Sequence, residues 1–352
     1  MTTSFDYIIK LFDEIKHMNK LPKEYCIVFV YNSPETMSDT SHLSECVYPE
    51  ELNMILDAFG EIAETVMSID GEDSFIATAP IMKKQFQQVL VYSLAQNLNG
   101  DGRRSLVPLL CEYYGFINIG ANFFSCAIAR SKDIMYSLLK EKGFPFPRTY
   151  YIYSTKNISE AVDFIDEGKW LLKPNNESSS IGLEVYDFSQ MSSEQVYYIL
   201  EEYIKKYPCF CVQEFIDGEE VAVPILRVND DYYCPGISQV NFPEGKTYID
   251  YDMIMFESYD YFEYNGNLKE ALIDISARVA AELKLTAMCR IDYRISGNDF
   301  YIEDIGANPT ISTYNGVNQL YCDHLQASPS CVYAIITYAA LIENGLFIPS
   351  FN

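Results

Sequence analysis

The chain has 352 residues, 49% of them apolar, so it is long enough to form two or three domains with sizeable cores. Its 25 basic and 50 acidic residues give a formal charge of −25 at pH 7. Such a negative field repels phosphate backbones and anionic membranes, and we therefore expect neither nucleic acid nor a membrane surface as a partner.

The first 120 residues alternate between helical and strand patterns. Apolar residues at helical spacing predict the helices, and continuous apolar runs such as YCIVFVY predict the strands. One helix starts at Pro49 and is expected to end before Gly60. The alternation indicates a parallel α/β sheet. In chain order we predict helix 4–18, strand 25–31, helix 49–59, strand 88–94, helix 105–114 and strand 116–120.

The middle of the chain, about 130–215, has an α+β pattern. Its first helix is closed by Gly143 and its last carries a serine N-cap signal. The predicted elements are helix 131–142, strand 148–154, helix 158–168, strands 169–174 and 181–187, and helix 192–208. The stretch 209–228 is predicted as two strands joined by a turn at Asp217-Gly218.

The last part of the chain is also α+β. An aromatic and acidic segment, 246–264, follows a strand and precedes a strongly periodic helix. A Gly-Asn turn then joins the two strands of a hairpin. The predicted elements are strand 232–240, helix 271–285, hairpin 288–306, a loop over 308–321 and a final helix over 325–343.

The ten cysteines include no CxxC pair and the chain has only three histidines, so a zinc site is not expected. The start of the chain lacks a basic region followed by an apolar run, and therefore does not read as a signal peptide. The apolar run CVYAIITYAALI is too short to span a bilayer. We expect a cytoplasmic protein with reduced thiols.

The run KPNNESSSIG, residues 173–182, follows an apolar strand. A lysine beside small serines suits a phosphate group, because the hydroxyl and backbone N–H groups can approach its oxygens closely. A surface hairpin loop would have a similar composition, so the run alone leaves both interpretations open.

The same run resembles the phosphate-covering pattern K-P-x-x-E-G-S-S-x-G of D-alanine–D-alanine ligases, which belong to the ATP-grasp superfamily. Three further stretches resemble the family in the same order, and the likeness covers about 88–320: GDGRRSLVPLLCEYYGFINIGANFFSCAIARSKDIMYSLLKEKGFPFP, CVQEFIDGEEVAVPIL and CRIDYRISGNDFYIEDIGANPTIS. The resemblance implies a three-domain fold, with an N-terminal parallel α/β domain (1–128), a central α+β lid domain (129–212) and a C-terminal α+β catalytic domain (213–352).

The resemblance also implies roles for particular residues. ATP would be bound by Lys132 and Lys173 at its phosphates, by Glu220 at its ribose, by the serine loop of Glu177, Ser178, Ser179 and Ser180, and by an adenine hinge of Gln213, Glu214, Phe215 and Ile216. Asp292 and Asp304 would hold Mg²⁺ or Mn²⁺, for which carboxylate oxygens are suitable ligands. Arg290 and Lys173 would act in catalysis, and Asn315 and Asp101 are candidate substrate contacts.

Simpler interpretations exist for four of these residues. Arg290 and Asp292 share one strand face, and could form an ordinary ion pair. Glu220 could be a solvated charge at a strand edge, and Lys132 a lysine on a helix surface.

Several positions depart from the family pattern. Asp304 and Gly306 replace a glutamate and an asparagine, and Ile254 replaces a lysine near the γ-phosphate. Glu303 and Asn308 are candidate replacement ligands, although Glu303 should face away from Asp304 in a regular strand. The candidate replacement lysines are Lys246 and Lys269.

The substrate end differs as well, because the segment after the first strand contains no glycine. Glu35 and Glu45 are both candidates for the glutamate that meets the first substrate's amine. We therefore do not predict D-alanine as the substrate.

The resemblance implies an ATP-dependent ligase that joins a carboxylate to an amine through an acylphosphate. We expect both substrates to be small molecules, and specifically amino acids. ADP and phosphate are released, and a homodimer is expected. The alternative is a nucleotide-binding relative without turnover, which Gly306 and Ile254 favour and Arg290 disfavours. An unrelated acidic interaction module would bind no nucleotide.

Overall fold

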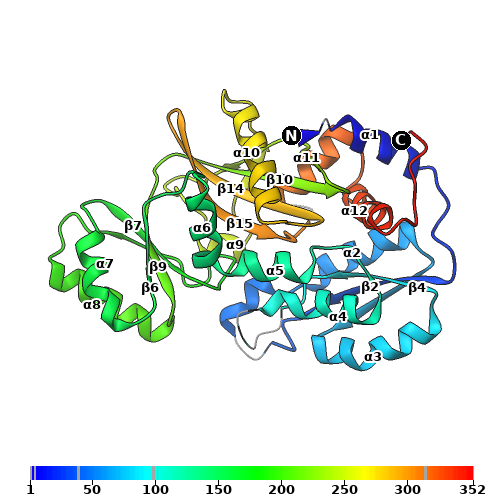
Figure 1. Cartoon of the computed structure of the whole chain (residues 1–352), viewed down its shortest axis with the longest axis horizontal. Helices are drawn as coiled ribbons and strands as arrows, with labels where there is room; N and C mark the ends of the chain where they lie inside the picture. Colours follow the sequence, from blue (N-terminus) through cyan, green and yellow to red (C-terminus); the bar gives the residue numbers. More distant parts are fainter. Residues whose placement is uncertain are drawn as a thin grey trace.

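The computed structural model describes residues 2–3, 5–37, 40–96, 100, 102–312 and 315–351. In this part of the chain the strands form three sheets, and each sheet is covered by helices that follow its strands in the sequence (Figure 1). The combination of one parallel α/β sheet with two α+β sheets agrees with the fold class predicted from the sequence.

The N-terminal sheet has four parallel strands in the order β3-β2-β4-β5. Its central strands are apolar on both faces, as expected for a parallel sheet covered on two sides. The strands are β2 (Tyr25–Tyr31), β3 (Thr65–Asp70), β4 (Gln88–Ser93) and β5 (Ile117–Asn118). The accompanying helices are α1 (Asp6–Ile15), η1 (Thr40–Glu45), α2 (Pro49–Ile62), α3 (Glu72–Gln85), η2 (Arg103–Ser105) and α4 (Leu106–Tyr114).

The central sheet is antiparallel, with the order β6-β9-β7-β8. Two helices, α5 (Phe123–Arg130) and α6 (Lys132–Glu141), lead into it from the N-terminal sheet. Its strands are β6 (Thr149–Ile152), β7 (Lys169–Pro174), β8 (Glu184–Asp187) and β9 (Phe210–Glu214). It is covered by η3 (Thr155–Asn157), α7 (Ile158–Phe164) and α8 (Ser193–Lys206), and α8 begins with the capping box of Ser192 and Gln195.

The third sheet contains the hairpin that carries most of the candidate site. Strand β10 (Glu219–Val228) lies in its middle and pairs with β14 (Met288–Ser296), which in turn pairs with β15 (Asp299–Ala307). The other strands are β1 (Thr2–Thr3), β11 (Asp231–Tyr233), β12 (Ser238–Asn241) and β13 (Asp260–Glu263). The helices of this part are α9 (Tyr251–Met255), α10 (Lys269–Glu282), α11 (Gly316–Leu325) and α12 (Ser330–Glu343).

Some sequence-based predictions of elements are wrong. The predicted loop 308–321 contains the start of α11, whose N-cap Asn315 accepts a hydrogen bond from the backbone N–H of Val317. The predicted final helix over 325–343 begins later than expected, since α12 starts only at Ser330. Helix α2 continues past Gly60, where a side chain would meet no atom within 4 Å. Strand β3 and helix α3 were not predicted.

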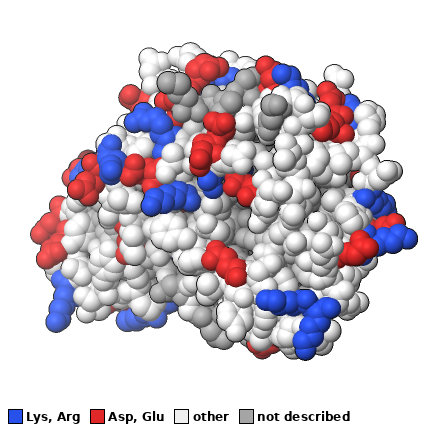
Figure 2. All heavy atoms as spheres, turned by 45° about the vertical axis from the view of Figure 1, so that its right-hand side comes forward, with Lys and Arg blue, Asp and Glu red and all other residues white. Residues whose placement is uncertain are grey.

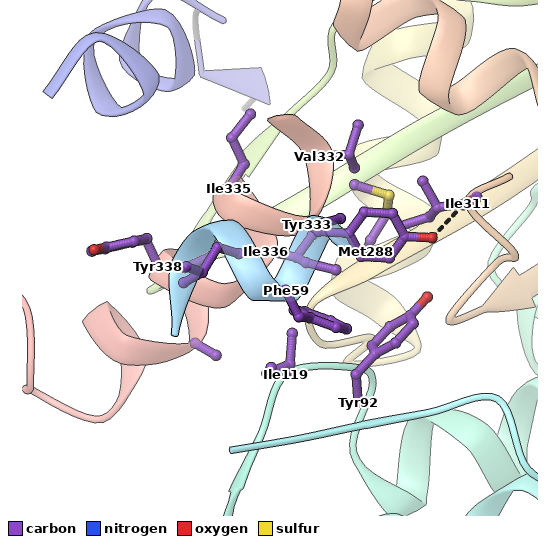
Figure 3. Packing of buried hydrophobic residues seen from close by; sticks show 14 of the residues in the cluster. Phe59, Tyr92, Ile119, Met288, Ile311, Val332, Tyr333, Ile335, Ile336 and Tyr338 are labelled. Carbon is purple, nitrogen blue, oxygen red and sulfur yellow. Dashed lines mark hydrogen bonds between the residues drawn. The ribbon is translucent and has the colours of Figure 1, made fainter. Parts of the chain in front are cut away.

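One hydrophobic core joins the first and third sheets. Figure 3 shows Tyr333 and Ile336 of α12 packed against Phe59 of α2, with Tyr92 and Met288 beside them. The Tyr333 hydroxyl donates a hydrogen bond to the Ile311 carbonyl, which ties α12 to the segment after β15. The central sheet packs its own core around Trp170. The N- and C-terminal parts therefore share their packing, and the central sheet has a core of its own, while α6 packs against the third sheet.

Charges of both signs are distributed over the surface. On the face drawn in Figure 2, lysines and arginines are interspersed with acidic residues. In the described part of the chain, no single helix has both the length and the apolar composition to cross a membrane; α11 and α12 reach these values only together, and they are bent by 90°.

Candidate active site

A cavity of about 850 Å³ lies where the three sheets meet. Eleven of the predicted site residues line it, and they come from all three parts of the chain: Lys132, Lys173, Glu177, Ser178, Ser179, Ser180, Glu220, Arg290, Asp292, Asp304 and Asn315. The motifs found along the sequence are thus brought to one place. Asp101, a further candidate, lies outside the described residues.

Two lysines enter the cavity from the central part. Lys173 is the penultimate residue of β7, and its Nζ lies 3.3 Å from Glu303 Oε1. Lys132 is the first residue of α6, and its Nζ donates a hydrogen bond of 2.5 Å to the backbone carbonyl of Glu177. Burial lowers the pKa of Lys132. This lysine is therefore not a surface residue of its helix, and a phosphate would stabilise its charge.

Arg290 and Asp292 lie on one face of β14, as the i, i+2 spacing predicts. The guanidinium donates from Nε and Nη2 to the two carboxylate oxygens, each over 2.7 Å. Burial raises the pKa of Asp292, although Arg290 opposes the shift. The two residues form an ion pair in the cavity wall, so the simpler interpretation is confirmed, and their role in the site stays a prediction.

A β-bulge adds a third carboxylate to this wall. Asp292 pairs with Asp304 but Tyr293 pairs with Ile302, so Glu303 has no partner opposite it. Both Glu303 and Asp304 therefore line the cavity. The expectation that Glu303 faces away is wrong, because it assumed an unbroken strand. The Tyr136 hydroxyl donates to the Glu303 carbonyl at the bulge.

Glu220 is held by an arginine at the edge of the cavity. Arg294 Nη1 lies 3.0 Å from Glu220 Oε2. Burial, and after it the charge of Glu303, raises the pKa of Glu220 to about 8. The carboxylate is consequently not a solvated charge at a strand edge, and it lies close enough to the bulge to be affected by Glu303.

The serine loop is fixed by side chains from the N-terminal part. Ser178 Oγ donates to Glu45, and Arg103 Nη2 lies 2.7 Å from Glu177 Oε2. Glu45 also pairs with Arg103 and with Arg130, at 3.2 Å in each case. Burial acts to raise the pKa of Glu45, but the charges of Arg130, Arg103 and Arg104 and the hydrogen bond from Ser178 outweigh it, and the pKa is lowered.

Of the two glutamates left open by the sequence, Glu45 lines the cavity, and Glu35 is exposed and does not. The two lysines proposed as replacements for the family lysine at Ile254 can be compared in the same way. Ile254 lines the cavity, whereas Lys246 pairs with Asp250 and Lys269 lies 2.8 Å from Glu263. Neither lysine is among the residues of the cavity wall.

The four predicted hinge residues, all in the described part of the chain, are not among those that line the cavity. Gln213 is fully buried, with Nε2 donating to Thr149 and Oε1 unpartnered. The Ile216 carbonyl accepts a hydrogen bond from Arg294 Nε. Apolar side chains line the cavity near this hinge: Leu171, Ile181, Leu183 and Ile249.

The carboxylates fit a hard divalent cation that arrives with a nucleotide. Asp292, Glu303 and Asp304 face one cavity, and Glu303 Oε2 is buried without a hydrogen-bond partner. Mg²⁺ is usually held by one or two carboxylates together with phosphates and water. Within the described residues, no three acidic, histidine or cysteine side chains are arranged to hold an ion by themselves. At Gly306 a Cβ would meet no atom nearer than the Arg290 carbonyl oxygen, at 3.9 Å, so packing does not require glycine there.

Sequence reasoning missed some residues of the cavity and its surroundings. Arg104 and Glu51 line the wall, and Arg103 and Arg130 pair with Glu45, which also lines it. The adjacent arginines in GDGRRS were a signal, since arginine is uncommon in this acidic chain. The contacts join segments near residues 45, 103, 130 and 177, which no local pattern connects.

The arrangement of three sheets around a cavity with two lysines and a carboxylate-bearing hairpin defines an ATP-grasp fold. Solved structures support this: the chain matches D-alanyl-alanine synthetase A from Vibrio cholerae with a TM-score of 0.70 and 15% identity, over 91% of this chain and 99% of that one. It matches the D-alanine–D-alanine ligase from Bacillus anthracis, complexed with ATP, with a TM-score of 0.66 and 14% identity over the same shares.

The family follows from the sequence comparison. Residues 146–324 match the family model described as D-ala D-ala ligase C-terminus, which covers half of the chain. The D-alanine–D-alanine ligase of Pseudothermotoga lettingae is 24% identical over 262 residues, 73% of this chain and 82% of that protein. That of Helicobacter pylori is 23% identical over 277 residues, 74% of each chain. The chain belongs to the D-alanine–D-alanine ligase family.

Proposed function

We propose that this chain is an ATP-dependent ligase that forms an amide bond between a small carboxylate and an amine, with release of ADP and phosphate. One observation carries the proposal. The cavity brings Lys132 and Lys173 of the central part opposite Arg290, Asp292 and Asp304 of the β14–β15 hairpin. Members of the family use ATP with Mg²⁺, and the named relatives act on amino acids.

In this proposal the protein positions the reactants and neutralises charge. Lys132 and Lys173 bind phosphate oxygens, and Asp292, Asp304 and Glu303 provide oxygens for Mg²⁺. The cation, when bound, neutralises charge on the phosphates. The substrate carboxylate attacks the γ-phosphate to give an acylphosphate, and the amine then displaces phosphate from the acyl carbon. Arg290 stabilises the oxyanion that develops in the second step.

The serine loop and the segment 246–264 would keep water away from the acylphosphate. Ser180 Oγ donates a hydrogen bond of 2.8 Å to the Ile249 carbonyl, so the two segments are in contact. Exclusion of water matters here because water competes with the amine. The contact supports a closed arrangement of both segments over the cavity.

The alternative, nucleotide binding without turnover, is not favoured, since the named relatives are ligases and Arg290 is present in the cavity. The substrates differ from D-alanine in our proposal, since the segment after the first strand, which is glycine-rich in D-alanine ligases, contains no glycine here. We propose Asn315 as a substrate contact at the far end of the cavity.

The proposal is tested with the purified protein, ATP, Mg²⁺ and a pool of L- and D-amino acids. We expect release of ADP and phosphate that depends on the pool, and an amide product visible by mass spectrometry. Lys173→Ala should weaken nucleotide binding by about 100-fold or more, because a charge-assisted contact to the phosphates is lost.

Lys156→Ala is the matched control, since Lys156 is an exposed lysine of the same part of the chain. Tight nucleotide binding with no product from any amino acid would favour the alternative. Equal nucleotide affinity of the wild type and Lys173→Ala would refute the phosphate assignment.

Three further proposals concern the whole protein. We divide the chain at 1–128, 129–212 and 213–352; the second boundary falls inside β9. We place the protein in the cytoplasm, where its ten free cysteines would stay reduced. We also propose a homodimer through the N-terminal part, where α3 and α4 expose apolar side chains: Ile76, Ile81, Leu109 and Tyr113.

A further inference from the structure

Glu51 is a partly buried carboxylate of the cavity wall. It lies in the first turn of α2, and its Oε1 is buried without a hydrogen-bond partner. A carboxylate in this turn of a helix is usually hydrated, and the helix dipole then favours its ionised form. Here burial, and after it the charge of Glu257, raises the pKa to about 7. Among the described residues, the only charge that acts on Glu51 is thus that of another carboxylate, so its ionised form lacks a cation.

The hydroxyl group of Tyr92 is a second buried oxygen near Glu51. Tyr92 lies in β4 and is only 1% exposed, and its hydroxyl has no hydrogen-bond partner. Burial, and after it the charge of Glu51, raises the pKa of Tyr92, so the two groups lie close to each other. A buried oxygen without a partner is unfavourable. Two such oxygens at one place indicate a ligand that donates hydrogen bonds there.

These groups lie at the part of the cavity where we expect a substrate. The charge of Glu51 also acts on the pKa of Tyr333. The Tyr333 hydroxyl donates to the carbonyl of Ile311, and the residues on either side of Ile311, Thr310 and Ser312, line the cavity. The lysines proposed for the phosphates belong to the central part of the chain, and their charges do not act on Glu51. The ligand of Glu51 is therefore not the nucleotide.

Glu45, the other carboxylate that the N-terminal part gives to the cavity, is already engaged. It pairs with Arg103 and Arg130, at 3.2 Å in each case. The charge of Arg104 also acts on Glu45, and it is not among the charges that act on Glu51. A cation that enters the cavity from solvent would therefore be attracted to Glu51 rather than to Glu45.

The wall around Glu51 combines apolar and acidic side chains. Met54 of α2 and Ile254 and Met255 of α9 line the cavity, and so does the exposed Glu257. Apolar groups beside carboxylates suit a ligand with an aliphatic stem and a positively charged tip. A metal ion fits less well, because no three acidic, histidine or cysteine side chains in the described part of the chain are arranged to hold one.

We propose that Glu51 binds a positively charged side chain of one of the two substrates, a charge additional to the amino group that every amino acid carries. This inference rests on the proposed ligase function and narrows one substrate to a basic amino acid. An ammonium or guanidinium group has several N–H donors, so it can serve Glu51 Oε1 and a second oxygen together. A neutral side chain of the same shape would leave the carboxylate unpaired, and this difference gives the selectivity.

The test compares basic amino acids with neutral counterparts of similar length: lysine with norleucine, and arginine with citrulline, each in its L and D form. Isothermal titration of the purified protein at pH 8, with a non-hydrolysable ATP analogue and Mg²⁺, measures their binding. ADP release with ATP and pairs of amino acids measures turnover. We expect at least one basic amino acid to be preferred over its neutral counterpart by about 10–100-fold. Equal values in the wild type would overturn the inference without any variant.

Glu51→Gln should remove this preference. It should raise KM for the basic amino acid by about 10–100-fold, with little change for the neutral counterpart and an unchanged KM for ATP. Glu51→Asp should keep part of the preference, since the charge remains on a shorter side chain. Glu61→Gln, at an exposed glutamate of the same helix, is the matched control. A Glu51→Gln variant that keeps the preference contradicts the assignment.

Fragmentation of the amide product in the mass spectrometer identifies which substrate carries the charge, because it shows whether the basic residue supplied the carboxylate or the amine. If the wild type shows no turnover but prefers basic amino acids through Glu51, the binding site stands while the ligase function fails. If it joins neutral amino acids as readily as basic ones, the ligase function stands and this inference is wrong.

Discussion

Glu51 is a carboxylate that the fold holds in a poorly hydrated part of the cavity. It lies in the first turn of α2, and its Oε1 is buried with no hydrogen-bond partner. Burial, and after it the charge of Glu257, raises the pKa of Glu51 to about 7. Unfolding returns the group to an ordinary carboxyl pKa of about 4.3, so the folded state binds this proton more tightly.

Replacing Glu51 by glutamine removes this titration. The stabilisation that the proton gives the folded wild type is fully present below the unfolded pKa, and is lost as the pH rises through about 7. We therefore expect the stability of Glu51→Gln relative to the wild type to increase by about 1–3 kcal/mol between pH 5 and pH 8. Urea unfolding at the two pH values measures it.

Glu61→Gln is the control for this prediction, because Glu61 is an exposed glutamate on the same helix. Its stability relative to the wild type should not depend on pH. Parallel pH profiles of Glu51→Gln and the wild type would mean that Glu51 is already well hydrated in the folded protein.

At the scale of elements, the serine loop combines backbone strain with side-chain anchors. Ser179 and Ser180 both adopt φ of 53°, a left-handed conformation that costs an L-residue about 1 kcal/mol. Contacts of the loop with Glu45, Arg103 and Lys132 hold it in this shape. The N-terminal part of the chain therefore fixes the conformation of a loop that belongs to the central part.

Glu45→Ala tests this coupling. It leaves Arg103 and Arg130 without their shared carboxylate, so we expect the free energy of unfolding to fall by about 3–5 kcal/mol. Hydrogen exchange of the amides of the serine loop should become at least ~10-fold faster, because the loop loses its anchor. Glu35→Ala, at an exposed glutamate of the same region, should change neither quantity. Unchanged exchange in Glu45→Ala would show that the loop is held without it.

Elements with strong local patterns could be predicted from the sequence. The apolar runs of β2, β4 and β7 are buried over most of their length, which is why they could be recognised. Strand β3 is only partly buried and α3 carries an internal proline, so neither has a clear period. Helix α11 was mistaken for a loop because glycine and asparagine at its start suggested a turn.

Prediction of the site residues from the sequence was limited in the same way. Lys132, Lys173, Arg290 and Asp292 stand in motifs whose order along the chain could be read directly. The position of Glu303 depends on a bulge, and the partners of Glu45 depend on the packing of distant segments. Local spacing along the sequence encodes neither the position of Glu303 nor the partners of Glu45, so only the folded structure reveals them.

At the scale of the whole molecule, the core around α12 makes one body of the N- and C-terminal parts. Figure 3 shows α12 between Phe59 of α2 and Met288 of β14. The central sheet keeps its own core and meets the other parts at the cavity, and α6, which leads into this sheet, packs against the third sheet. Binding of a nucleotide between Lys173 and Asp304 would therefore bring together two separately packed bodies.

The proposed dimer is tested on the α4 surface. Tyr113 is 77% exposed and Leu109 is 46% exposed, and α4 lies beside α3. We expect the double variant Leu109→Ser, Tyr113→Ser to sediment as a monomer at concentrations where the wild type is a dimer, because the apolar contact is lost. Ile348→Ser is the control, since Ile348 is 78% exposed near the end of the chain. A monomeric wild type, or a dimeric double variant, would contradict the proposal.

The bulge at Glu303 also affects how this chain is compared with its relatives. Two adjacent acidic residues share one place opposite Asp292, because the ladder skips from Asp304 to Ile302. In a relative with an unbroken ladder, a single residue occupies that place, and either Glu303 or Asp304 can be its counterpart in space. Columns of a written alignment cannot decide between them. Loss of one codon here would leave a single acidic group, so a small deletion would change which carboxylate oxygens face the cavity.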